Sequence, residues 1–284
     1  MTDDTTRRKL LFGIGAASTV ALAGCGGGGN GNGGNGNGNG GNGDGGNGNG
    51  NGDMTTTEDG MNGGMTTTED GMGGGTANVR VAHMSPNAPN VDVYVDSEDP
   101  VLSDVPFGAV SDYLEVPAGE RSVEITAAGD PDTSVFSGPV PVEADTDYTI
   151  AATGEIGEEA DEPFEPLVLE DDNSEVGSNQ ARLRVVHASP DAPAVDVTAA
   201  GGDVVLFDGV PYGGSGYTEV EANDYTVQIR GDTESNDGDV AADFDVSLNG
   251  GTVYTAFAAG YLSPDDEPQD TPFDLIVAQD ASFN

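Results

Sequence analysis

Apolar and polar residues follow three different patterns along this chain of 284 residues. A continuous apolar run occupies residues 10–23, and residues 26–75 hold almost no apolar side chain. Beyond residue 76, apolar and polar residues alternate in short segments, for example at 91–95 and 122–127. Alternation at every second residue is typical of a strand with one buried face. The pattern therefore predicts a leader, a linker and a β-rich region.

Residues 1–25 predict an export signal that carries a lipid anchor. The 14-residue apolar run is too short to cross a bilayer as a helix, which needs about 20 residues. Arg7 and Arg8 precede it and resemble a twin-arginine (Tat) signal. Residues 22–25, Leu-Ala-Gly-Cys, resemble a lipobox, which implies lipidation of Cys25 and anchoring to the outer face of the cytoplasmic membrane. The alternative is an uncleaved hydrophobic anchor.

Residues 26–75 predict a disordered linker rich in Gly, Asn and Thr. Residues 26–52 contain only Gly, Asn and Asp44, and an 11-residue unit then occurs twice, at 54–64 and 65–75. Such a composition buries too little apolar surface to offset the entropy cost of ordering. The threonine triplets in the two units are either O-glycan sites or plain spacer.

A long internal repeat follows the linker. Residues 79–93 match residues 183–197 at ten of 15 positions, with an offset of 104 residues. Each copy is about the size of one domain. We therefore expect two tandem domains, at 76–173 and 178–284, after the signal at 1–25 and the linker at 26–75. The short polar connection near 171–179 allows either a loose or a fixed pair.

Each copy predicts an all-β domain, because no segment beyond residue 75 shows a convincing helical period. Short strands separated by turn signals favour two immunoglobulin-like antiparallel β-sandwich domains, with small antiparallel barrels as the alternative. Tyr148 and Tyr254 also resemble the tyrosine corner of immunoglobulin-like domains. In that corner a tyrosine hydroxyl bonds back to the preceding backbone.

The charge balance excludes nucleic-acid binding and predicts a protein that works in very high salt. The chain has 51 acidic against 8 basic residues, a net charge of −43, so it lacks the basic footprint of a nucleic-acid binder. Residues 76–284 hold 43 of the acids and five arginines. Their repulsion is largely screened at about 1 M salt, where the Debye length is about 3 Å. The scattered acids therefore predict adaptation to very high salt.

The repeated motif supplies the candidate site residues, which we interpret as structural. We expect each histidine ring to bond to the nearby serine hydroxyl and to the Ala-Pro loop, and each arginine to pair with the aspartate, Arg80 with Asp92 and Arg184 with Asp196. A Ser-His hydrolase with Asp92 or Asp196 as the third member is the catalytic alternative. The residues are Arg80, His83, Ser85, Pro86 and Asp92 in the first copy, and Arg184, His187, Ser189, Pro190 and Asp196 in the second.

Metal and cofactor chemistry is not predicted. One cysteine and two histidines cannot build a standard zinc site. Residues 232–239 resemble a calcium loop superficially, but the sixth residue is Asp237 where an EF-hand needs Gly. We interpret this segment as an acidic hairpin loop. The acidic loops at 155–162 and 263–270 occupy equivalent places in the two copies, so they are candidate binding loops.

The opening motif of each copy, with the later Pro-Phe-Gly at 106–108 and Pro-Tyr-Gly at 211–213, resembles the domain-of-unknown-function family 4397. The second copy departs from it at 221–223, where Glu-Ala-Asn replaces a Pro-Ala-Gly turn. The resemblance implies a β fold in exported proteins, and no biochemical activity is established for the family.

The sequence thus predicts a lipid-anchored envelope protein that is not an enzyme. Its two β-sandwich modules would serve surface binding, adhesion or envelope spacing. The expected partners are the membrane, through the lipid on Cys25, and an envelope protein or glycan, with no nucleic acid and no cofactor. Oligomeric state is left open. The alternatives are an envelope hydrolase that uses the His/Ser motif and a calcium-dependent adhesin.

Overall fold

A computed structural model describes residues 74–283 except Glu159. The predictions for the export signal (Arg7, Arg8), the lipidated Cys25 and the linker lie outside the described residues. Among the described residues, no helix is long and apolar enough to cross a membrane.

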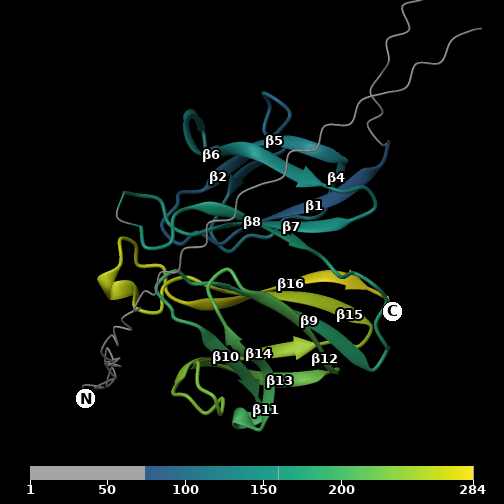
Figure 1. The fold of residues 1–284 in the computed structure, drawn as a ribbon, viewed down its shortest axis with the longest axis vertical. Coiled ribbons are helices and arrows are strands. Elements are labelled where there is room, and N and C mark those ends of the chain that lie inside the picture. Colours follow the sequence, from purple (N-terminus) through teal and green to yellow (C-terminus); the bar gives the residue numbers. More distant parts are fainter. Residues whose placement is uncertain (1–73, 159, 284) are drawn as a thin grey trace, which may run out of the picture. The chain divides into compact units, whose positions relative to one another are not determined.

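Each copy consists of eight strands, which confirms the predicted all-β fold (Figure 1). The first copy contains β1 (Thr76–His83), β2 (Val91–Val95), β3 (Leu102–Val105), β4 (Leu114–Pro117), β5 (Gly119–Ala127), β6 (Asp130–Val142), β7 (Asp147–Thr153) and β8 (Glu165–Glu170). The second contains β9 (Gln180–Ala188), β10 (Val195–Ala199), β11 (Val204–Val210), β12 (Ser215–Glu221), β13 (Asn223–Gly231), β14 (Val240–Leu248), β15 (Thr252–Ala259) and β16 (Asp274–Ser282), with short 3-10 turns η1 (Ala200–Gly202) and η2 (Pro264–Asp266).

The strands of each copy form two packed sheets, as the sandwich prediction requires. In the first copy, the sheet β4-β1-β7-β8 packs on the sheet β3-β2-β5-β6. The second copy repeats this order as β12-β9-β15-β16 on β11-β10-β13-β14. One pair in each copy departs from the antiparallel expectation, because β1 runs parallel to β7 and β9 runs parallel to β15.

Valine and isoleucine line the facing sides of the two sheets of each copy. In the first copy, Val81 from β1, Val93 from β2 and Ile125 from β5 belong to one cluster and are buried. Val185, Val197 and Ile229 are their counterparts in the second copy. Each copy therefore has a hydrophobic core of its own.

The tyrosine corner expected from the sequence is present in both copies. The Tyr148 hydroxyl accepts a hydrogen bond from the backbone N–H of Glu143 at 3.2 Å, and the Tyr254 hydroxyl accepts one from Asn249 at 3.1 Å. In each case the bond reaches five residues back along the chain. The bond closes the turn between β6 and β7 in the first copy and the turn between β14 and β15 in the second.

Strands β1, β7, β9 and β15 are buried on both faces, so the two sheets that contain them lie against each other (Figure 1). An apolar cluster joins them and includes Ala82, Met84, Val186 and Phe257, each with 0% exposure. We name this cluster, together with the charged residues beside it, the inter-copy interface. The alternating segments at 91–95 and 122–127 belong to the outer sheet β3-β2-β5-β6 of the first copy.

Candidate functional site

The repeated histidine and serine are buried and bonded to backbone carbonyls in both copies. His83 Nε2 bonds to the carbonyl oxygen of Pro89 at 3.0 Å, and His187 Nε2 bonds to Pro193 at the same distance. These contacts confirm the expected bond between each ring and the Ala-Pro loop. Both rings have 0% exposure.

The serine hydroxyls have a different partner from the one expected. Ser85 Oγ donates to the carbonyl oxygen of Gly154 at 2.5 Å, and Ser189 Oγ donates to Gly260 at 2.6 Å. The prediction of a bond between serine hydroxyl and histidine ring is therefore wrong. Each serine instead ties the end of the first strand to a glycine with positive φ, 78° at Gly154 and 88° at Gly260. A side chain at either glycine would collide with a neighbouring carbonyl.

Burial gives the histidines a predictable effect on stability. Burial lowers the pKa of His83 and of His187, and the carbonyl hydrogen bond opposes this shift only in part. As the pH falls below about 6.5, these two histidines therefore take up protons in the unfolded chain before they do so in the folded chain. The free energy of unfolding should therefore fall as the pH drops below about 6.5.

Replacing both histidines by glutamine tests whether they cause this loss of stability at low pH. Gln keeps an N–H donor for the carbonyl but does not titrate. We expect the slope of unfolding free energy against pH between 7 and 5 to become shallower, by up to about 1.4 kcal/mol per pH unit for each histidine. Urea titrations of both chains across this range provide the measurement, and parallel slopes would contradict the assignment.

The motif aspartates organise turns and do not pair with the motif arginines. Asp92 accepts backbone N–H bonds from Asp104 at 2.8 Å and Gly129 at 2.9 Å. Asp196 does the same for Gly209 and Thr233. The expected Arg80–Asp92 and Arg184–Asp196 pairs are therefore wrong, because these carboxylates are occupied by the backbone on the outer sheets.

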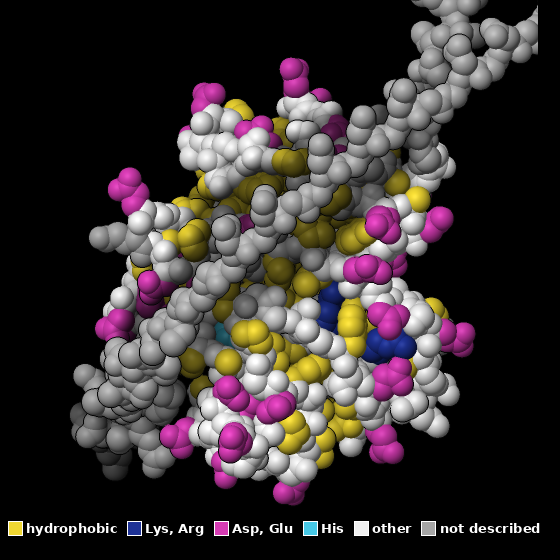
Figure 2. Space-filling model, in the orientation of Figure 1, with side chains coloured by type: hydrophobic (Ala, Val, Ile, Leu, Met, Phe, Trp, Pro, Cys, Tyr) yellow, Lys and Arg dark blue, Asp and Glu magenta, His cyan; other side chains and the backbone are white. Residues whose placement is uncertain are grey.

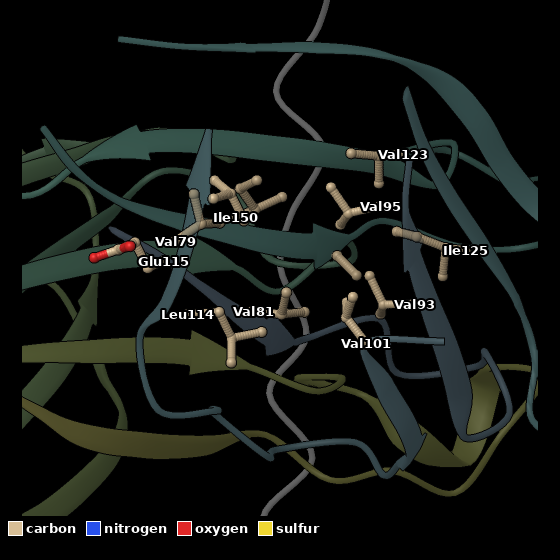
Figure 3. Close-up of a pocket in the computed structure, with 12 residues that line it drawn as sticks. Val79, Val81, Val93, Val95, Val101, Leu114, Glu115, Val123, Ile125 and Ile150 are labelled. Carbon is tan, nitrogen blue, oxygen red and sulfur yellow. The ribbon is translucent and has the colours of Figure 1, made fainter. Parts of the chain in front are cut away.

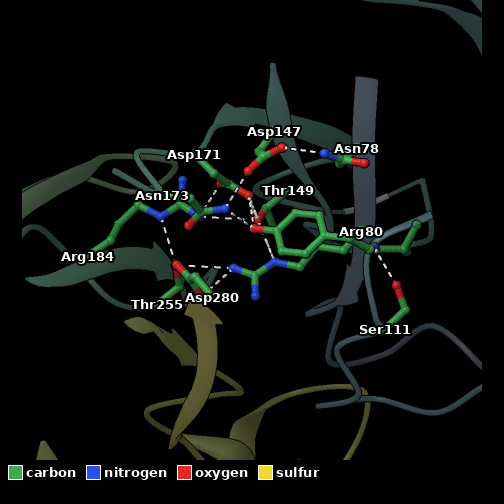
Figure 4. Close-up of polar contacts among 12 residues, drawn as sticks. Asn78, Arg80, Ser111, Asp147, Thr149, Asp171, Asn173, Arg184, Thr255 and Asp280 are labelled. Atoms are coloured by element: carbon green, nitrogen blue, oxygen red, sulfur yellow. Dashed lines mark hydrogen bonds and ion pairs between the residues drawn. The ribbon is translucent and has the colours of Figure 1, made fainter. Parts of the chain in front are cut away.

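The motif arginines instead reach across the inter-copy interface (Figure 4). Arg80 Nη2 lies 2.6 Å from Asp280 Oδ1, on the last strand of the second copy. Arg184 Nη2 lies 2.5 Å from Asp171 Oδ1, just after the last strand of the first copy. All four charged groups are buried, with side-chain exposures of 2% or less.

Two threonines complete this network from the equivalent position of each copy. Thr149 accepts from Arg80 Nε at 2.8 Å and from Arg184 Nη2 at 3.2 Å. Thr255 accepts from Arg184 Nε at 3.0 Å and from Arg80 Nη2 at 3.3 Å. Each guanidinium therefore contacts the threonine of its own copy and that of the other, which is the reciprocal pattern of an isologous interface.

Two tyrosines cover the guanidinium groups. Arg80 lies 5.0 Å from the ring centre of Tyr113, and Arg184 lies 5.1 Å from that of Tyr217. Tyr113 also donates to Asp171 at 2.6 Å. Burial raises the pKa of both tyrosines, and burial raises the pKa of Asp280 against the opposing Arg80 charge. The network is thus shielded from solvent.

The predicted connection between the copies is fixed by the same network. Asp171 belongs to it, and the backbone N–H of Asp172 donates to the Tyr217 hydroxyl at 3.1 Å. Arg182 then bonds to Ser174 and Asp172. Of the two arrangements that the sequence allowed, the structure has the fixed pair.

Three carboxylates gather beside the acidic loop of the second copy. Asp196, Asp208 and Asp232 each place a carboxylate oxygen within 4.8 Å of the others. The amide nitrogen of Asn236, in the orientation that satisfies its neighbours, donates to Asp208 at 2.8 Å and to Asp196 at 3.1 Å. The Asn236 amide of the acidic loop therefore bonds to two of the three carboxylates.

The two candidate binding loops start next to each other. Tyr261, just before the loop 263–270, donates its hydroxyl to Glu155 Oε1 at 2.6 Å, and both side chains are buried. Burial, with the charges of Asp191 and Glu155, raises the pKa of Glu267. The loops therefore share one acidic end of the two-copy unit.

A cleft of about 300 Å³ opens near this end, between the two copies. Thr153, Glu162 and Glu165 from the first copy line it, together with Tyr212 from the second. Burial raises the pKa of the Tyr212 hydroxyl, and the surrounding carboxylates add to the rise. The cleft therefore offers hydrogen-bond acceptors beside a partly buried aromatic ring.

These features define a class, the tandem β-sandwich protein whose two copies share a buried contact. A comparison with models of known families then identifies the family. The model of DUF4397, a domain of unknown function, matches residues 77–198 and 184–282, so the chain belongs to this family. This confirms the resemblance seen in the repeated motif.

No curated protein matches the chain. Among solved structures, the Bacillus anthracis TIE protein is similar over 65% of this chain at 10% identity, with a TM-score of 0.21. The match spans about a third of that protein, 34% of its length.

Proposed function

We propose that this chain is a lipid-anchored, exported envelope protein whose two β-sandwich copies act as one non-catalytic binding and spacing module. The observation that carries the proposal is the inter-copy interface, which joins the copies through a buried ionic network and an apolar cluster. A fixed pair presents its loops in one constant arrangement. Such an arrangement suits recognition of an extended envelope component.

The geometry of the His/Ser motif supports the non-catalytic part. A serine nucleophile needs a base within hydrogen-bond reach. Here both serine hydroxyls donate to glycine carbonyls, and both histidines bond to proline carbonyls, away from solvent. A substrate has no access to either group in this arrangement.

The acidic surface supports a high-salt setting. Figure 2 shows acidic side chains scattered over the visible face, with Lys and Arg confined to small areas. Salt at molar concentration shortens the range of their mutual repulsion to about 3 Å. The interior ion pairs are screened much less, so the interface and a high-salt environment are compatible.

The cleft beside Tyr212 is the proposed contact region for an envelope glycan or protein. Its carboxylate and hydroxyl oxygens accept hydrogen bonds, which favours a ligand rich in hydroxyl groups. A pull-down from envelope extract, at multimolar salt, uses the full chain with Cys25→Ser as bait. We expect a glycan or glycoprotein that Tyr212→Ala fails to retain.

Two other results of this experiment would contradict the binding role. An empty eluate from folded bait would leave only the spacer function. Turnover in a hydrolase screen that is lost in His83→Ala and His187→Ala, with the fold retained, would favour the enzyme.

The anchor has its own test. Cys25→Ser should move the chain from the membrane fraction to the soluble fraction, because the thiol is the only site for a lipid. Met84→Leu, inside the folded region, serves as a control that should stay with the membrane. If the Cys25→Ser chain remained in the membrane, an uncleaved hydrophobic anchor would replace the lipid in the proposal.

A further inference from the structure

An apolar cavity of about 230 Å³ lies between the two sheets of the first copy (Figure 3). Val79 and Val81 on β1 and Ile150 on β7 line one wall. Val93 on β2 and Ile125 on β5 line the other. Glu115 borders the cavity, but Figure 3 shows its carboxylate directed away from the other labelled side chains. The interior is therefore walled by aliphatic groups.

The cavity reaches solvent at the edge of the sandwich. The edge strands β3 and β4 of the two sheets lie on this side. Val101, immediately before β3, lines the cavity and is 42% exposed, and Leu114 on β4 is partly buried. An unbranched molecule can thus enter from the side without any strand leaving its sheet.

The second copy differs at the matching positions in both directions, because the strand registers place Thr218, Ala256 and Ala199 where the first copy has Leu114, Ile150 and Val95. Leu183 stands at the position of Val79, and the registers of the paired strands make Leu206 the equivalent of Val101 and Phe207 the equivalent of Leu102. All three are packed in or against the core of the second copy. Leucine at the positions of Val79 and Val101 is therefore compatible with this fold.

From these observations we infer that the first copy binds the hydrocarbon chain of a lipid in this cavity. An engineered cavity of about 150 Å³ with apolar walls stays dry and accepts benzene. Scaling benzene by volume gives an occupant of about nine carbons. Apart from Glu115, the described residues that line the cavity are aliphatic, which selects the alkyl end of the lipid and leaves its head group outside.

The methionines of the linker are the competing occupant. Met54, Met61, Met65 and Met72 are the apolar residues that precede β1, which itself lines the cavity. A methionine side chain has only four heavy atoms, so it would leave more than half of the cavity empty. The alkyl chain fits the volume better.

The test titrates the full chain carrying Cys25→Ser with 1-octanol and follows the valine methyl signals by NMR. We expect shifts at the cavity valines, with 1-butanol at least tenfold weaker. Val79→Leu with Val101→Leu should weaken octanol binding at least tenfold. Val277→Leu, an exposed valine outside the cavity, should leave it unchanged.

Three outcomes would overturn the inference. The cavity valines could show no shift, the filled variant could bind octanol as well as the parent chain, or octanol could bind no better than butanol. Replacing the four linker methionines by serine should leave the affinity unchanged. A tenfold rise would assign the cavity to the linker instead. None of these results depends on whether the cleft beside Tyr212 binds a glycan.

Discussion

Replacing Asp171 by alanine is expected to lower the free energy of unfolding by about 3–5 kcal/mol. The carboxylate is fully buried and meets Arg184 at 2.5 Å, and it also accepts hydroxyl bonds from Thr149 and Tyr113. Its removal leaves a buried guanidinium without its charge partner. Urea unfolding in high salt measures the loss.

An exposed pair of the same chemistry provides the control. Glu219 lies 2.9 Å from Arg182, with 43% of its side chain exposed. Glu219→Gln should therefore cost about 0–1 kcal/mol, and raising the salt should reduce this loss further. The Asp171 loss should persist in the same salt. Equal losses in the two variants would contradict the burial of the network.

A double variant separates the charge from the packing. Arg184→Met in the Asp171→Ala background removes the unpaired charge, so it should recover much of the stability that Asp171→Ala loses. Arg184→Met alone should be destabilising, because it leaves Asp171 without its closest cation. Additive losses would mean that the two residues act independently.

The sequence was informative about each copy and silent about their contact. Alternation, turn signals and the internal repeat predicted the strands, and the two corner tyrosines were placed correctly. The ionic network was missed because its partners lie far apart: Arg80 and Asp280 are 200 residues apart in sequence. Asp171 falls in a segment that looks like a plain polar linker.

One signal for the interface is present in the chain. The segment 252–259 is apolar or small at nearly every position, and 181–188 is so except at Arg182, Arg184 and His187, unlike the strands that alternate strictly. Near-continuous apolar runs are typical of strands buried on both faces. The arginines and threonines within them obscured this pattern, because a charged residue on a strand usually faces water.

The error at the serines has a local cause. Ser85 and His83 are two apart on one strand, so their side chains were expected to meet on one face. The strand ends at His83, however, and Ser85 lies beyond it, just before the bend at 86–88. Its hydroxyl then points to Gly154, beyond the end of the neighbouring strand β7. Periodicity cannot predict a partner once the strand has ended.

Replacing Phe257 by alanine is expected to cost about 3–5 kcal/mol through a cavity in the inter-copy interface. Phe257 has 0% exposure and packs with Ala82, Val186 and Met84. The register places Ala151 at the matching position of the first copy, so alanine is compatible with the strand itself. The loss should therefore come from the interface rather than from the strand.

The shape of the unfolding curve distinguishes this contact from an ordinary core. Each copy has its own hydrophobic core, so a weakened interface lets the copies unfold separately. Urea titration followed by circular dichroism should show one transition for the parent chain and a broader or double transition for Phe257→Ala. Phe244→Ala, at a partly buried position in the core of the second copy, should keep a single steep transition. A sharp transition with a loss below about 1 kcal/mol in Phe257→Ala would mean that the two copies do not stabilise each other.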